Sequence, residues 1–155
     1  MSTRDGYIFY EAGQAVAAVY LGLTVRHVSV DPAHRATEIV IPRQDSRARM
    51  ILWLTGMAAE KKGAGKSDPL RQMRTRQRVR ATIDALTPHE DSASRRKVAA
   101  HNLLNQAQDR ANAICASLFP AIREVATQLR EKGAVTGEEV KVAVLAARRP
   151  VTVSA

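Results

Sequence analysis

The stretch Tyr10-Glu11-Ala12-Gly13-Gln14 lies in a segment whose apolar residues recur at helical spacing. This spacing is typical of a helix with one buried face, so we predict a helix over residues 3–22 that stops at Gly22. Tyr10 and Gln14 are one helical turn apart and therefore share a face, with Glu11 beside them. These three polar side chains form the first candidate site of the chain.

The spacing of the three side chains matches a motif of metal-dependent hydrolysis. In the pattern His-Glu-x-x-His, two imidazoles one turn apart bind zinc, and the glutamate acts as general base on the metal-bound water. Here Glu11 and the spacing are kept, but Tyr10 and Gln14 stand at the two ligand positions. An amide is a poor zinc ligand beside imidazole, and a phenol ionises only at about pH 10.

Two short segments rich in β-branched residues follow the first helix. Residues 25–30 and 37–41 flank the turn signal Asp31-Pro32, and this pattern predicts a β-hairpin or a small sheet. Apolar periodicity then predicts two further helices, over residues 45–62 and 68–86.

The second half of the chain is predicted to be helical throughout. The run Thr87-Pro88-His89-Glu90 has the composition of a helix start, so we expect a long helix from there to Gly133, with a kink at Pro120. A capping box between Thr136 and Glu139 predicts a last helix up to Ala147.

These elements predict a mainly α (α+β) fold with a small β-hairpin after the first helix. We assign residues 1–149 to a single domain and residues 150–155 to a flexible tail.

The composition is that of a globular and basic protein. The 155 residues carry a formal net charge of +9 and 45% are hydrophobic, which argues against wholesale disorder. Cys115 is the only cysteine, so a disulfide framework and a cysteine-based zinc site are excluded within one chain. We expect a cytoplasmic location, no membrane span and no secretory signal.

Several motifs, in the same order along the chain, resemble the peptidase domain of FtsH-type AAA+ zinc metalloproteases. Tyr10-Glu11-Ala12-Gly13-Gln14-Ala15 stands where that family reads HEAGHA, and Leu54-Thr55-Gly56-Met57-Ala58-Ala59-Glu60 is similar to its Leu-x-Gly-Arg-Ala-Ala-Glu helix. The other segments that resemble the family are residues 25–30, 65–68 and 131–140. The resemblance covers about residues 7–147 and implies a mainly helical domain with a small β-hairpin.

The resemblance implies roles for four positions. In the family, two signature histidines and a downstream aspartate bind zinc, and the signature glutamate activates water. Glu11 corresponds to the general base and Asp68 to the third ligand, whereas Tyr10 and Gln14 replace both histidines. The resemblance therefore implies a domain without zinc or peptidase activity, in which Glu11 is a catalytic relic.

Alternatives remain for each of these residues. An active metalloendopeptidase would need atypical ligands drawn from Glu11, Asp68 and His27. Asp68 also has the position of a helix N-cap, since proline is favoured directly after it. Tyr10 and Gln14 either line a vestigial pocket or pack at a helix interface.

Five arginines without an intervening acid lie in residues 71–80. Arg71, Arg74 and Arg78 share one predicted helix face, which suits an acidic protein or nucleic-acid phosphates, or is a solvated surface. Three functions follow: a pseudopeptidase with a binding or regulatory role, an active zinc metalloendopeptidase, and a basic nucleic-acid-binding module. The first needs no cofactor and implies a protein partner, and a homo-oligomer is compatible with it.

Overall fold

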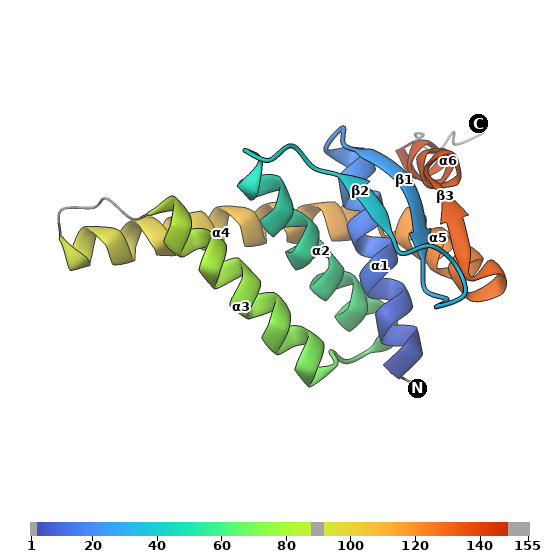
Figure 1. Cartoon of the computed structure of the whole chain (residues 1–155), viewed down its shortest axis with the longest axis horizontal. Helices are drawn as coiled ribbons and strands as arrows, with labels where there is room; N and C mark the ends of the chain where they lie inside the picture. Colours follow the sequence, from blue (N-terminus) through green and yellow to red (C-terminus); the bar gives the residue numbers. More distant parts are fainter. Residues whose placement is uncertain (1–2, 88–91, 149–155) are drawn as a thin grey trace, which may run out of the picture.

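The computed structural model describes residues 3–87 and 92–148 (Figure 1). The helices are α1 (Thr3–Tyr20), α2 (Ser46–Ala64), α3 (Pro69–Leu86), α4 (Ala93–Ser117), α5 (Phe119–Lys132) and α6 (Gly137–Arg148). The strands are β1 (Thr24–Ser29), β2 (Glu38–Val40) and β3 (Ala134–Thr136). The predicted mainly α fold with a small β element is confirmed.

The main core surrounds α1, which packs against α2, α5, α6 and β1. Buried small and branched residues line α1, and Ala12, Ala15 and Val16 are fully buried. The backbones of α1 and α2 approach closely because both helices carry glycine at the crossing. A Cβ atom on Gly13 would lie 2.6 Å from the Cβ of Ala59 and 3.0 Å from the carbonyl oxygen of Thr55. This contact fixes the candidate face of α1 against α2.

The three strands form an antiparallel sheet in the order β2-β1-β3. The predicted hairpin is confirmed, with Val25 of β1 opposite Ile39 of β2. The sequence did not predict β3, which pairs with the other edge of β1 and places Thr136 opposite His27. β1 is therefore the central strand and links an early segment of the chain, β2, to a late one, β3 (Figure 1).

The helix start predicted at Thr87 is wrong. The hydroxyl of Thr87 donates a hydrogen bond to the carbonyl of Ile83 (2.9 Å), so Thr87 closes α3. The next helix begins after Ser92, whose hydroxyl accepts a hydrogen bond from the backbone N–H of Arg95 (3.2 Å). The predicted capping residues Pro88, His89 and Glu90 lie outside the described residues, as does the predicted tail.

The single kinked helix predicted to end at Gly133 is instead two helices. α4 ends at Ser117, α5 begins at Phe119, and Leu118 lies between them. Pro120 occupies the first turn of α5, where its missing N–H costs no helical hydrogen bond.

Local capping chemistry agrees with the prediction at the last helix. The backbone N–H of Glu139 donates to the hydroxyl of Thr136 (3.2 Å), and the backbone N–H of Thr136 donates to the Glu139 carboxylate (3.3 Å). This reciprocal pair is the predicted capping box, and α6 follows it. Every helix within the described ranges is too short or too polar to cross a bilayer.

Candidate functional site

Helices α1, α2 and α3 bring three side chains to the guanidinium of Arg71, and Asp68 lies beside them at the start of α3. We call this group the Arg71 cluster, and its members are Tyr7, Tyr10, Glu60, Asp68 and Arg71. Glu60 of α2 is only 2% exposed, and its carboxylate lies 2.7 Å from Nη1 of Arg71. The backbone N–H of Asp68 donates to the other oxygen of Glu60. Both oxygens of this buried carboxylate are therefore satisfied from α3 and the turn before it.

Two aromatic rings of α1 enclose the guanidinium further. The Cζ atom of Arg71 lies 5.3 Å from the ring centroid of Tyr7 and 5.8 Å from that of Tyr10. A cation within about 6 Å of an aromatic face is attracted to it, more strongly where water is excluded. Arg71 is thus the cation of the cluster and joins three helices.

Tyr10 points from α1 toward α3. Its hydroxyl lies 2.8 Å from the hydroxyl of Thr75, and both side chains are buried. Burial raises the pKa of Tyr10, so the phenol stays neutral at physiological pH. On the α2 side, a Cβ atom on Gly56 would meet the Tyr10 ring and the Cγ of Gln14, each at 3.1 Å. Tyr10 and Gln14 therefore pack at the helix interface, which was one of the two predicted alternatives.

Glu11 faces the segment that precedes β2. Burial raises the pKa of its carboxyl group, while hydrogen bonds from Thr37 and Tyr7 and the charge of Arg71 oppose that rise. Glu11 therefore lies in different surroundings from its neighbour Tyr10, whose hydroxyl bonds to Thr75.

Because the pKa of Glu11 is raised, this carboxyl group should make the free energy of unfolding depend on pH. The ionised carboxylate is disfavoured in the fold relative to the unfolded chain, and this cost is absent below the ordinary pKa of 4.5, where both states are protonated. Glu11→Gln keeps the shape and removes the charge. We expect it to raise the free energy of unfolding at about pH 7 and to change it little at about pH 4, as measured by urea unfolding. A loss of stability at the higher pH would contradict this expectation.

Asp68 lies at the start of α3. Its carboxylate accepts a hydrogen bond from the backbone N–H of Arg71 (2.9 Å), so Asp68 is the N-cap that its proline neighbour indicated. The three arginines of the predicted basic face do not share one environment. Arg71 is held in the cluster, whereas Arg74 and Arg78 are exposed.

The donor set does not fit a zinc ion. The Tyr10 phenol is neutral and bonded to Thr75, the Asp68 carboxylate caps a helix, and the Arg71 cation would repel a second cation. His27, the proposed atypical ligand, bonds through Nε2 to the carbonyl of Ala36. Within residues 3–87 and 92–148, no three His, Cys, Asp or Glu side chains gather as a metal site, so Glu11, Asp68 and His27 are not brought together.

Sequence reasoning missed the pairing of Glu60 with Arg71. The signal was an acid among the buried alanines of α2, together with an arginine one turn into the next helix. No family model matches the chain, and no curated protein matches it closely enough to count as a relative. The resemblance to FtsH-type peptidases therefore rests on the motifs of the chain itself.

Proposed function

We propose that this chain is an FtsH-type peptidase-like domain that has lost zinc binding and proteolysis and acts by binding a partner protein. The order of the motifs supports the relationship. The observation that carries the loss of activity is the Arg71 guanidinium, which is paired with Glu60 and lies over Tyr10. A cation that belongs to the chain itself lies beside one of the two positions where the family has histidine.

The chemistry of the cluster supports binding more than hydrolysis. Peptide hydrolysis in a zinc protease needs a metal-bound water for the general base to deprotonate. Glu11 has the general-base position, but burial raises the pKa of its carboxyl group, against the influence of Thr37, Arg71 and Tyr7. With tyrosine and glutamine in place of the two histidines, Glu11 would lack the metal-bound water that a general base deprotonates.

A role, a location and a kind of partner follow for a domain of this type. We infer a regulatory or scaffolding role, a cytoplasmic location that suits the single buried Cys115, and a protein partner. Self-association into a homo-oligomer is compatible with this role.

Metal content and casein cleavage test the proposal together. The protein is purified without chelator and without a histidine tag, analysed for zinc, and incubated with casein beside its Glu11→Gln variant. We expect far less than one zinc per chain and no cleavage above that of the variant. One zinc per chain, with cleavage that disappears in Glu11→Gln, would instead establish an active metalloendopeptidase with atypical ligands.

A further inference from the structure

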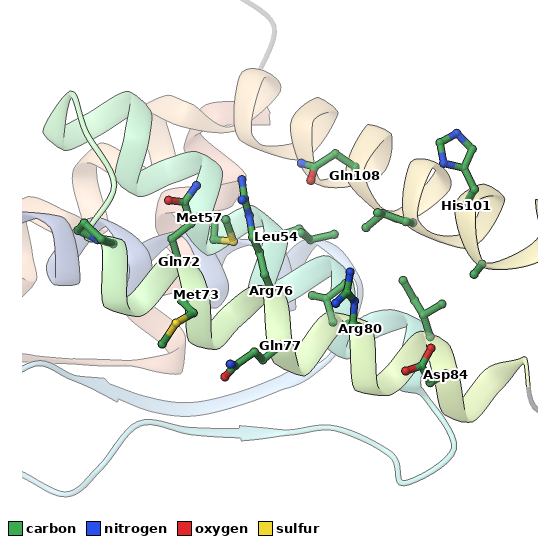
Figure 2. Close-up of a pocket in the computed structure, with 15 residues that line it drawn as sticks. Leu54, Met57, Gln72, Met73, Arg76, Gln77, Arg80, Asp84, His101 and Gln108 are labelled. Atoms are coloured by element: carbon green, nitrogen blue, oxygen red, sulfur yellow. The ribbon is translucent and has the colours of Figure 1, made fainter. Parts of the chain in front are cut away.

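A groove runs between α3 and α4 with α2 as its floor, and we call it the α3–α4 groove (Figure 2). It encloses about 780 Å³, and its apolar lining includes Leu54, Met57, Val79, Ile83 and Leu104. Leu54, Val79 and Ile83 belong to a small core cluster that is separate from the main core. Leu104 is 37% exposed, so part of the apolar lining faces solvent.

The rim of the groove is basic. Figure 2 shows Arg76 and Arg80 projecting from α3 toward α4. Neither arginine takes part in a salt bridge within the described part of the chain. A smaller hollow of about 430 Å³ shares residues with the groove and adds Arg96 and Lys97 from the first turns of α4. Among the described residues, Asp84 is the only acid in either lining, so a negatively charged ligand is favoured.

We propose that the α3–α4 groove binds an acidic amphipathic helix of a partner protein. Such a helix offers apolar side chains one turn apart to the floor, and its flanking carboxylates meet Arg76 and Arg80. α3 has 18 residues, so the wall of the groove is about 27 Å long and matches a helix of about four or five turns. The flexible side chains of Met57 and Met73 in the lining adapt to the occupant.

Other occupants fit less well. The phosphates of a nucleic acid would pair with the arginines of the rim, but they make no favourable contact with the leucine and methionine side chains of the floor. Among the described residues of the two linings, His101 carries the only aromatic ring, and none is a tyrosine, phenylalanine or tryptophan, so the groove offers bases little on which to stack. A second copy carries the same net charge of +9, and its basic surfaces would be repelled by the rim. This inference does not depend on the relationship to FtsH.

The test uses a fluorescein-labelled synthetic peptide and fluorescence anisotropy. The probe is a helix of about 18 residues with leucines along one face and glutamates beside them. We expect micromolar binding that Arg76→Glu/Arg80→Glu weakens at least about ten-fold. The matched control is Arg74→Glu/Arg78→Glu, which makes the same charge change on another exposed face of α3 and is expected to weaken binding less than about three-fold.

A second pair of variants tests the apolar part of the site. Leu104 and Val98 are both exposed on α4, but only Leu104 lines the groove. Leu104→Ser is expected to weaken the peptide about five-fold, whereas Val98→Ser should leave its affinity unchanged.

Several results would overturn the proposal. Equal weakening by both arginine pairs would show only general attraction between opposite charges. A version of the peptide with lysine in place of glutamate that binds as tightly would remove the charge argument, and so would an absence of binding at about 100 μM peptide. A DNA duplex that displaces the peptide would assign the groove to nucleic acid. Self-association of the chain that is lost in Arg76→Glu/Arg80→Glu would assign it to a second copy.

Discussion

Arg71→Ala is expected to lower the free energy of unfolding by about 3–5 kcal/mol, because it leaves a buried carboxylate without its cation. Glu60 is 2% exposed, and the Arg71 side chain is only 20% exposed, so water cannot readily replace the lost guanidinium. The variant also removes the cation that lies over Tyr7 and Tyr10. Both losses weaken the junction between α1, α2 and α3.

Urea unfolding followed by circular dichroism measures this effect. The matched control is Arg74→Ala, which removes an exposed arginine from the same helix and is expected to change stability by less than about 0.5 kcal/mol. Adding Glu60→Gln to Arg71→Ala should recover part of the stability, since the unpaired charge is then gone. An Arg71→Ala variant as stable as the control would mean that the ion pair contributes little.

The second large effect is expected on the zinc affinity of variants that carry histidines at positions 10 and 14. Tyr10→His/Gln14→His restores the spacing of two imidazoles, yet we expect this double variant to bind zinc only weakly. Arg71 lies over the ring of Tyr10, and the Asp68 carboxylate is engaged as a helix cap. Adding Arg71→Ala removes the repelling charge and releases the Glu60 carboxylate as a ligand. The gain should be on the order of a hundred-fold in zinc affinity.

Competition with a chromogenic zinc chelator measures the two affinities, and circular dichroism shows whether each variant is folded. Arg74→Ala in the double-histidine background serves as the charge control and should give no gain. Glu60→Gln added to the triple variant should abolish the gain if Glu60 is the released ligand. Tight zinc binding by the double variant alone would show that Arg71 is no obstacle, and it would weaken the proposal that zinc binding and proteolysis have been lost.

The elements that could be predicted are those with local signals. Asp68 followed by proline marks the start of α3, and the capping box of Thr136 and Glu139 marks α6; both are confirmed. Thr87 and Ser92 carry similar capping chemistry five residues apart, and the sequence alone did not favour the correct one. β3 has three residues, and its pairing depends on a strand about a hundred residues earlier.

In the candidate site, too, features set by neighbouring residues could be predicted, and features set by packing between helices could not. The helix face that holds Tyr10 and Gln14 follows from spacing, and the N-cap role of Asp68 follows from the proline after it. Arg71 looked like a member of a solvated basic face because helical periodicity reports only positions on one helix. Its pairing with Glu60 is set by how α2 packs beside α3, and the α3–α4 groove depends equally on that packing. The acid among the alanines of α2 signals a buried charge but does not identify Arg71 as its partner, and the groove has no signal of its own in the sequence.

The central place of β1 affects how the chain folds during synthesis. β2 leaves the ribosome soon after β1 and can cover one edge, but β3 emerges about a hundred residues later. Until then, the backbone amides and carbonyls along the other edge have no native partner, and an uncovered strand edge tends to pair with other chains. The nascent chain thus exposes this edge of β1 while about a hundred residues are synthesised, and pairing with other chains is favoured during that interval.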